Sequence, residues 1–166
     1  MEFPFRLGNG IVIAPTRAEH AGQLEELQRA VFPTLADAER FKAPHYRRHV
    51  ELFPEGQFCA LDGKRVVGMT TTLRLRFDFD HIDHTFADIM AGGWLTTHDP
   101  EGDWLYGADI GTHPEARGKG IARSLYAACH ETVRRLGLRG QVSVGMPSGY
   151  GRLKDRMSAR DYYEFG

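Results

Sequence analysis

Residues 106–122, YGADIGTHPEARGKGIA, constrain the fold more than any other segment, because a strand pattern passes there through a glycine-rich turn into a helix pattern. The apolar and aromatic residues of 104–112 predict a strand, and residues 118–136 predict an amphipathic helix. Residues 141–146 predict another strand. This order predicts a β-α-β unit with a right-handed crossover, and therefore an α/β fold. The helix has its apolar residues on one face: Ile121, Leu125, Ala128, Cys129, Val133 and Leu136.

The N-terminal part of the chain predicts a strand followed by helices. Residues 11–15 form a short apolar run that predicts the strand, and Thr16 with Glu19 has the spacing of a capping box at the start of the next helix. Residues 35–52 have helical spacing, which Pro44 interrupts. We therefore expect two short helices there.

A β-hairpin is predicted after these helices. Residues 57–61 and 66–77 are rich in β-branched and aromatic types, and the Asp62-Gly63 pair between them favours a tight turn. Residues 78–103 then break the pattern with acids, histidines and glycines, so we expect an irregular insertion with a short helix or strand. Altogether the sequence predicts a mixed, mostly antiparallel sheet with helices on both faces.

Length and composition predict one globular domain over residues 1–166, with 42% hydrophobic and 26% charged residues. The net charge of −1 gives the whole molecule no field that would hold nucleic acid or an anionic membrane. No apolar run approaches the about 18 residues of a membrane helix, and the first residues lack the pattern of a signal peptide. We therefore expect a cytoplasmic protein without nucleic-acid or membrane partners.

The glycine-rich turn has the chemistry of an anion site. The free N–H groups of a first helical turn attract a negatively charged group, and the helix dipole adds to that attraction. Arg117 and Lys119 place two cations beside these N–H groups, and Gly118 and Gly120 allow close backbone approach. A strand-to-helix turn with no ligand is the alternative interpretation. The spacing fits neither a P-loop nor a dinucleotide-binding fingerprint.

The same turn resembles the coenzyme A signature of the GNAT superfamily of N-acetyltransferases, R/Q-x-x-G-x-G/A, with Arg117, Gly120 and Ala122 at its defined positions. The order of strand, loop, helix and next strand agrees with that superfamily over residues 11–146. The resemblance implies a GNAT-like fold, acetyl-CoA as cosubstrate and direct transfer of an acetyl or other short acyl group to an amine.

The resemblance also implies which residues hold coenzyme A. The pantetheine arm pairs with backbone groups of Ile110, Gly111 and Thr112, and the pyrophosphate lies over the loop. That loop comprises Arg117, Gly118, Lys119, Gly120, Ile121 and Ala122. Ser124 is a further candidate for a phosphate contact, although a serine one turn into a helix is as often only solvated.

Acyl transfer needs a base, because a free alkyl amine with a pKa of about 10.4 is almost wholly protonated at neutral pH. Asp109, inside the strand beside the expected pantetheine site, is the first candidate. The alternative interpretation is a carboxylate paired with an arginine. His113, just before a proline, is a second candidate base.

For the proton donor, the family commonly has a tyrosine in the pattern N-x-x-A-x-x-L/F-Y-x-x-x-G-F, and Tyr162 stands four residues before Gly166 as that pattern requires. Asp155 and Ser158 occupy the places of the asparagine and alanine, however, and the final phenylalanine is missing. Tyr163 and Tyr150 are therefore rival candidates, and a tyrosine pair is also typical of a packed helix end.

We expect no metal. The acids and histidines of the 78–103 insertion have no common metal-ligand spacing, and Cys59 and Cys129 lack the close spacing of zinc or redox sites. Both cysteines are predicted to be buried, unpaired thiols.

Charge is distributed unevenly along the chain. Residues 77–116 contain nine acidic residues and no lysine or arginine, whereas residues 117–166 contain ten basic and four acidic residues. The basic part suits coenzyme A phosphates, and the acidic part suits a cationic small-molecule or peptide amine. The sequence does not identify that amine.

Two further expectations concern function and assembly. A module that binds acyl-CoA without turnover is the alternative to an N-acetyltransferase. The last residues, 147–166, are too few for the helix and strands that usually complete a GNAT core, so we expect a shortened form of a longer protein or completion by a second subunit in a homodimer. A minimal variant whose sheet edge is shielded by the 78–103 insertion is the alternative.

Overall fold

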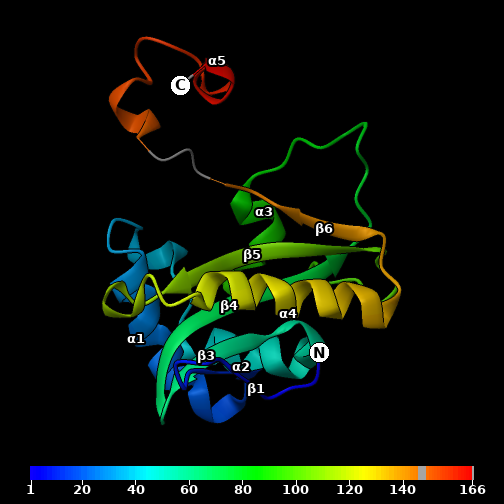
Figure 1. The fold of residues 1–166 in the computed structure, drawn as a ribbon. Helices are drawn as coiled ribbons and strands as arrows, with labels where there is room; N and C mark the ends of the chain where they lie inside the picture. The colour runs from blue at the N-terminus through cyan, green and yellow to red at the C-terminus, as the bar shows by residue number, and fades with distance from the viewer. Residues whose placement is uncertain (146–148, 166) are drawn as a thin grey trace.

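The computed structural model describes residues 1–145 and 149–165. Six strands form one sheet in the order of the sequence, and each pairs antiparallel with the next except the last two, which are parallel (Figure 1). Because β5 and β6 are parallel, the chain must cross over between them, and α4 is that crossover. The strands are β1 Phe5–Arg6, β2 Val12–Pro15, β3 Phe58–Asp62, β4 Arg65–Leu75, β5 Trp104–Thr112 and β6 Gly140–Ser143.

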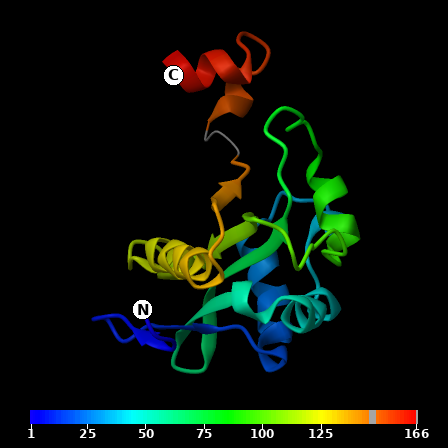
Figure 2. The ribbon, with the colours of Figure 1, turned by 90° about the vertical axis from the view of Figure 1, so that its right-hand side faces the viewer.

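Helices cover both faces of this sheet. The α-helices are α1 Ala21–Val31, α2 Ala43–Leu52, α3 Phe86–Met90, α4 Ile121–Leu136 and α5 Ala159–Phe165. Figure 2 shows α4 on one side of the sheet and α1 and α3 on the other. Short 3-10 helices comprise Ala18–His20, Asp37–Glu39, Pro54–Gly56, Ala91–Gly93, Pro114–Ala116 and Tyr150–Arg152.

Two apolar layers match these two faces. On the face of α1 and α2, Leu24 and Leu27 pack with Met69 and Leu73 of β4. On the opposite face, the buried residues of α4 pack on strands β2 and β3 of the sheet. These residues are Ile121, Leu125 and Ala128. The predicted amphipathic helix and the predicted burial of Cys59 and Cys129 as free thiols are confirmed.

The predicted hairpin is confirmed: β3 and β4 are antiparallel and joined by a turn in which Gly63 has φ +60°. The predicted mixed, mostly antiparallel sheet is confirmed as well. The insertion 78–103 contains the short helix α3, the 3-10 helix Ala91–Gly93 and otherwise turns and loops. The strand predicted over residues 141–146 is β6, and Met146 itself lies outside the described residues.

Three boundary predictions were wrong or inexact. Thr16 does not cap a helix: it is buried, and its N–H donates to Gln57 O at 2.9 Å, while the N–H of Arg17 donates to His20 Nδ1 at 3.0 Å. Pro44 lies within the first turn of α2, where its missing N–H is tolerated, instead of interrupting a helix. The helix expected from Gly118 begins at Ile121, because Gly118 and Gly120 have positive φ values of +76° and +78°.

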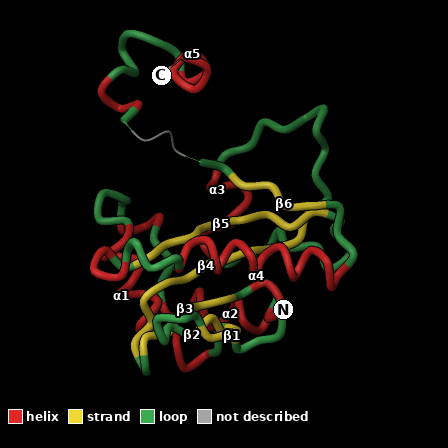
Figure 3. Tube along the Cα trace, in the orientation of Figure 1, coloured by secondary structure: helices red, strands yellow, loops and turns green. Residues whose placement is uncertain are grey.

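Residues 149–165 stand away from the sheet in two views at right angles (Figures 1 and 2). Helix α5 and the 3-10 helix Tyr150–Arg152 lie in this segment, as the trace coloured by secondary structure shows (Figure 3). Among the described residues, no helix is long and apolar enough to cross a membrane.

Candidate acyl-CoA and catalytic site

Strand β5 has an irregularity at its centre. Thr71 of β4 pairs with Asp109, but Thr72 pairs with Gly107, so Ala108 is an extra residue in β5. An extra residue of this kind is a β-bulge, which bends the strand and redirects its side chains. The bulge therefore lies next to Asp109, the predicted base.

The second half of β5 has an open edge. Strand β6 pairs with β5 only from Trp104 to Gly107, and no described residue pairs with that edge beyond the bulge. The N–H of His113 donates to Val67 O in β4, and backbone groups alternate sides along a strand. The backbone groups of Ile110 and Thr112 therefore face the open edge, whereas those of Gly111 face β4.

This edge can hold an extended ligand. Thr112 Oγ1 is buried and has no hydrogen-bond partner among the described residues. Gly111 cannot be enlarged without a clash, because a Cβ there would lie 2.8 Å from Val31 Cγ1. The predicted pantetheine contacts at Ile110 and Thr112 thus lie on the open edge and stay a prediction, whereas the backbone groups of Gly111 face β4 and do not point to that edge.

The glycine-rich loop leads from this edge to the N-terminus of α4. Gly120 is the N-cap residue in a left-handed conformation, and a Cβ on Gly118 or Gly120 would meet nothing within 4 Å. The loop surface is therefore open, and the first N–H groups of α4 have no partners within the helix. Arg117, Lys119 and Arg123 are exposed and form no ion pair with any described residue.

Two contacts fix the loop. Asn9, in the turn between β1 and β2, donates its side-chain amide to Lys119 O at 3.1 Å. The Ser124 hydroxyl donates to Gly120 O at 3.0 Å, so its proton is engaged in a hydrogen bond within the first turn of α4. The residues on the loop fit an anion such as the pyrophosphate of coenzyme A, and Ile121 and Ala122 begin the helix behind it.

Asp109 points to the opposite face of the sheet, towards α1 and α2. Its Oδ2 accepts a hydrogen bond from Gln28 Nε2 of α1, while its Oδ1 is buried and has no hydrogen-bond partner among the described residues. Burial raises the pKa of Asp109 to about 6, and hydrogen bonds from Thr71 and Gln28 partly oppose that rise. A carboxyl with a pKa near the working pH can exchange a proton there. Within the part of the chain that the structure describes, Asp109 forms no ion pair with an arginine, contrary to the alternative interpretation of the sequence.

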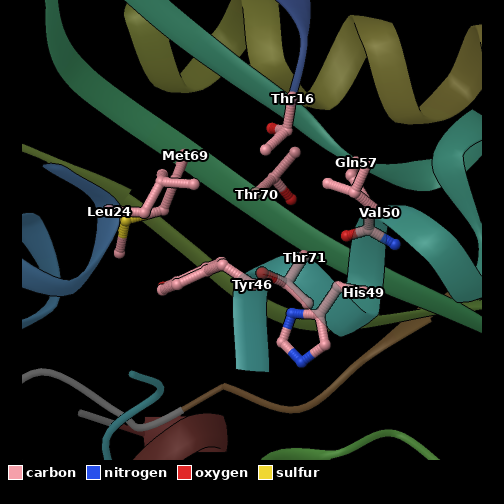
Figure 4. A pocket seen from close by; sticks show the side chains of 9 residues that line it. All are labelled: Thr16, Leu24, Tyr46, His49, Val50, Gln57, Met69, Thr70 and Thr71. Carbon is pink, nitrogen blue, oxygen red and sulfur yellow. The ribbon is translucent and has the colours of Figure 1, made fainter. Parts of the chain in front are cut away.

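The neighbours of Asp109 are also buried. Tyr46 of α2 and Thr71 of β4 lie side by side in the lining of a space that is too narrow for a water molecule (Figure 4). The Tyr46 hydroxyl has no hydrogen-bond partner among the described residues, and burial and the Asp109 charge raise the pKa of that phenol. His49, in the same lining, donates from Nε2 to Gly93 O at 2.6 Å, and burial lowers its pKa to about 4.

The other candidate residues lie elsewhere. Tyr162 is on α5, in the segment that stands away from the sheet, and its ring lies 5.5 Å from that of Tyr150. Tyr163 is 86% exposed. The structure therefore brings none of the three tyrosines to Asp109, and the role of Tyr162 stays a prediction. His113 accepts the N–H of Glu115 at Nδ1 and lies at the end of β5.

A sequence model described as the acetyltransferase (GNAT) family matches residues 22–166. The chain belongs to this GNAT family. Within residues 1–145 and 149–165, no three His, Cys, Asp or Glu side chains gather into a group that could hold a metal.

Two curated relatives come from Bacillus subtilis strain 168. A probable hydrolase, YhcX, is 33% identical over 159 residues, which cover 96% of this chain and 30% of that protein. An uncharacterized N-acetyltransferase, YkwB, is 34% identical over 116 residues, or 70% of this chain and 51% of that protein. This GNAT chain thus spans about a third to a half of the length of these relatives.

Solved structures confirm the fold. A GNAT-like decarboxylase, GphF, in complex with isobutyryl-CoA has a TM-score of 0.72 and 22% identity, over 92% of this chain and 75% of that one. A GNAT family acetyltransferase from Brucella melitensis in complex with acetyl-CoA has a TM-score of 0.53 and 16% identity, over 86% of this chain and 80% of that one.

Sequence reasoning missed Gln28, Tyr46, Thr71 and Asn9. Gln28 lies on the buried face of its helix, where a polar side chain must find a partner, and this was the available signal. Asn9 gave no such signal, because its turn is exposed and polar.

Proposed function

We propose that this chain is an N-acetyltransferase that transfers an acetyl or other short acyl group from its coenzyme A thioester directly to an amine. The observation that carries the proposal is the meeting of three features at one point of β5: the open strand edge, the anion-binding loop that follows it and the buried carboxyl at the bulge. Acyl-CoA chemistry needs all three, whereas a purely structural strand needs none of them.

Coenzyme A would bind on the α4 side. The pantetheine arm would extend the sheet along Ile110 and Thr112, and the pyrophosphate would lie on the N–H groups of Gly118 to Ala122. Arg117, Lys119 and Arg123 would add charge, since none of them pairs with a carboxylate among the described residues that would compete with phosphate. Binding there would place the thioester near the bulge.

Asp109 would accept the proton of the amine. As the amine nitrogen attacks the thioester carbonyl carbon, a C–N bond forms, the C–S bond breaks and the amine proton passes to Asp109. The departing thiolate takes a proton from solvent or from a tyrosine, for which Tyr162 stays the candidate. No covalent acyl-enzyme is required, and the buried thiols are unsuited to form one, because burial raises the pKa of Cys59 to about 12 and that of Cys129 to about 11.

The acceptor would approach from the face of α1, α2 and α3. A cavity of about 280 Å³ lies there between residues 38–41 and 85–93, with Phe41, Phe86 and Met90 among its lining residues. The Phe41 ring contacts that of Tyr46 edge-on, with centroids 5.9 Å apart, and so links the cavity to the neighbours of Asp109. Glu39 and Arg40 are both among the lining residues, but the Arg40 guanidinium donates to backbone carbonyl oxygens within residues 32–35, so Glu39 supports a cationic amine as the acceptor class.

A panel of amines tests the proposal. The chain is incubated with acetyl-CoA and with amino acids, polyamines, aminoglycosides or short peptides, and released coenzyme A is detected as free thiol. We expect amine-dependent release that Asp109→Asn reduces by about 10²-fold or more. Tight acetyl-CoA binding without release for any amine would instead support the non-catalytic binding module.

A further inference from the structure

Gln28 connects helix α1 to the candidate base. It lies one turn before the end of α1, is 3% exposed, and donates from Nε2 to Asp109 Oδ2 across 81 residues of sequence. A buried side-chain amide destabilises a fold unless it is hydrogen-bonded, and a leucine or methionine would suit this apolar helix face equally well. The position therefore has a polar residue for a reason other than packing.

The contact makes the two oxygens of the carboxyl unequal. Oδ2 has the Gln28 amide as donor, whereas Oδ1 is buried without a hydrogen bond among the described residues. A donor on one oxygen fixes the rotation of the carboxyl and leaves the other oxygen as the better proton acceptor. The bulge alone cannot do this, because it directs the side chain without fixing its last torsion.

We propose that Gln28 is a positioning residue for the acyl-transfer reaction: its amide anchors Asp109 Oδ2 and so fixes the rotation of the carboxyl that takes the proton from the amine. The inference rests on the proposed function. It assigns Gln28 no contact with substrate.

The groups packed around Asp109 allow a clear pH test. Tyr46 from α2 and Cys129 from α4 have pKa values raised by burial, and His49 of α2 has a pKa of about 4. Gln28 of α1 and Thr71 of β4 do not titrate. Between pH 5 and 8 these neighbours keep their charge states, so Asp109 is the group of this cluster that titrates in that range.

The experiment compares Gln28→Met and Gln28→Glu with the unchanged chain. Methionine keeps the length and removes the donor, which favours protonated Asp109, while glutamate adds a second acid beside it. We expect the acidic limb of kcat/KM to move up by about one pH unit in Gln28→Met and at least as far in Gln28→Glu. For Gln28→Met, kcat/KM falls about fivefold to tenfold at pH 5.5 and stays within about twofold at pH 8.5. KM for acetyl-CoA does not change.

Gln23→Met is the matched control on the same helix. The Gln23 amide donates to Lys64 O at 3.1 Å, and its oxygen accepts the N–H of Val66 at 2.9 Å, so it contacts backbone and not Asp109. Its loss should reduce stability and leave the pH profile in place. A uniform loss of activity at all pH values in Gln28→Met, or an unmoved limb, would overturn the inference.

A titration of the Asp109 carboxyl by NMR gives a readout that does not depend on turnover. We expect its pKa to rise in Gln28→Met and to stay unchanged in Gln23→Met. An unchanged pKa in Gln28→Met overturns the inference even if the chain transfers acyl groups. Failure of the unchanged chain to transfer an acyl group to any amine is a different result, which overturns the proposed function.

Discussion

Asp109→Asn tests the energetic consequence of the buried carboxyl. In the folded chain the pKa of Asp109 is raised from 3.8 to about 6 by burial, so the folded state disfavours the charged form more than the unfolded state does. The cost is absent below pH 3.8, grows as the pH rises and is fully present above about pH 6. Because each pKa unit corresponds to about 1.36 kcal/mol, charged Asp109 costs the folded state about 3 kcal/mol at pH 8.

Asparagine keeps the shape of the side chain and removes the charge. We expect Asp109→Asn to raise the free energy of unfolding at pH 8 by about 1 to 3 kcal/mol, since weaker hydrogen bonds to Gln28 and Thr71 offset part of the gain. At pH 4 the difference should fall below about 1 kcal/mol. The variant should also lose acyl transfer, so a more stable protein would be a less active one.

Urea unfolding at pH 4 and pH 8 measures both differences. Asp62→Asn, at the exposed end of β3 beside the hairpin turn, is the control and should change stability little at either pH. A variant that is less stable than the unchanged chain at pH 8, or a difference independent of pH, would refute the argument that burial sets the protonation of Asp109.

Four further predictions follow from other parts of the structure. Gly120→Val should weaken coenzyme A binding more than tenfold by calorimetry, because the φ of +78° is strained for a β-branched residue and the new side chain would obstruct the loop, whereas Gly63→Val in the hairpin turn should leave affinity unchanged. Burial lowers the pKa of His49 from 6.5 to about 4, so stability should fall by up to about 3 kcal/mol as the pH drops through that range, and His49→Gln should flatten the fall in unfolding experiments. The KM of a cationic acceptor should rise with salt if the acidic residues of 77–116 attract it, and a salt-independent KM would exclude that attraction. Light scattering should detect association of the chain through the edge of β6, which Val144 follows with 64% exposure, and a strictly monomeric chain would contradict this.

Much of the fold could be predicted because its signals are local. The hairpin around Gly63 and the helix after Gly120 depend on turn residues and on spacing within one segment. The predicted start of α4 was wrong because the spacing of apolar residues does not distinguish the two loop glycines, Gly118 and Gly120, from the first positions of a helix. The positive φ values of these glycines exclude a helix there, and a hydrophobicity pattern contains no information about backbone angles.

The candidate site could be predicted only where its parts are contiguous in sequence. Asp109 and the loop 117–122 lie within one short segment, so their proximity in the structure could be predicted from the sequence. The contact of Asp109 with Gln28 joins residues 81 positions apart, and Tyr46 comes from a third element, so tertiary packing decides both. The bulge at Ala108 could not be predicted either, because the pairing with β4 determines it and the composition of β5 does not.

The 3.1 Å hydrogen bond from Asn9 to Lys119 O fixes the orientation of a peptide group in the loop. The C=O of Lys119 and the N–H of Gly120 belong to one planar trans peptide, so they point in opposite directions. With the carbonyl oxygen held by Asn9, the N–H of Gly120 must face the other way. Asn9, which is far from the glycine-rich loop in sequence, thus orients the N–H of Gly120 before any phosphate binds. A loop ordered in advance loses less conformational entropy when its ligand binds.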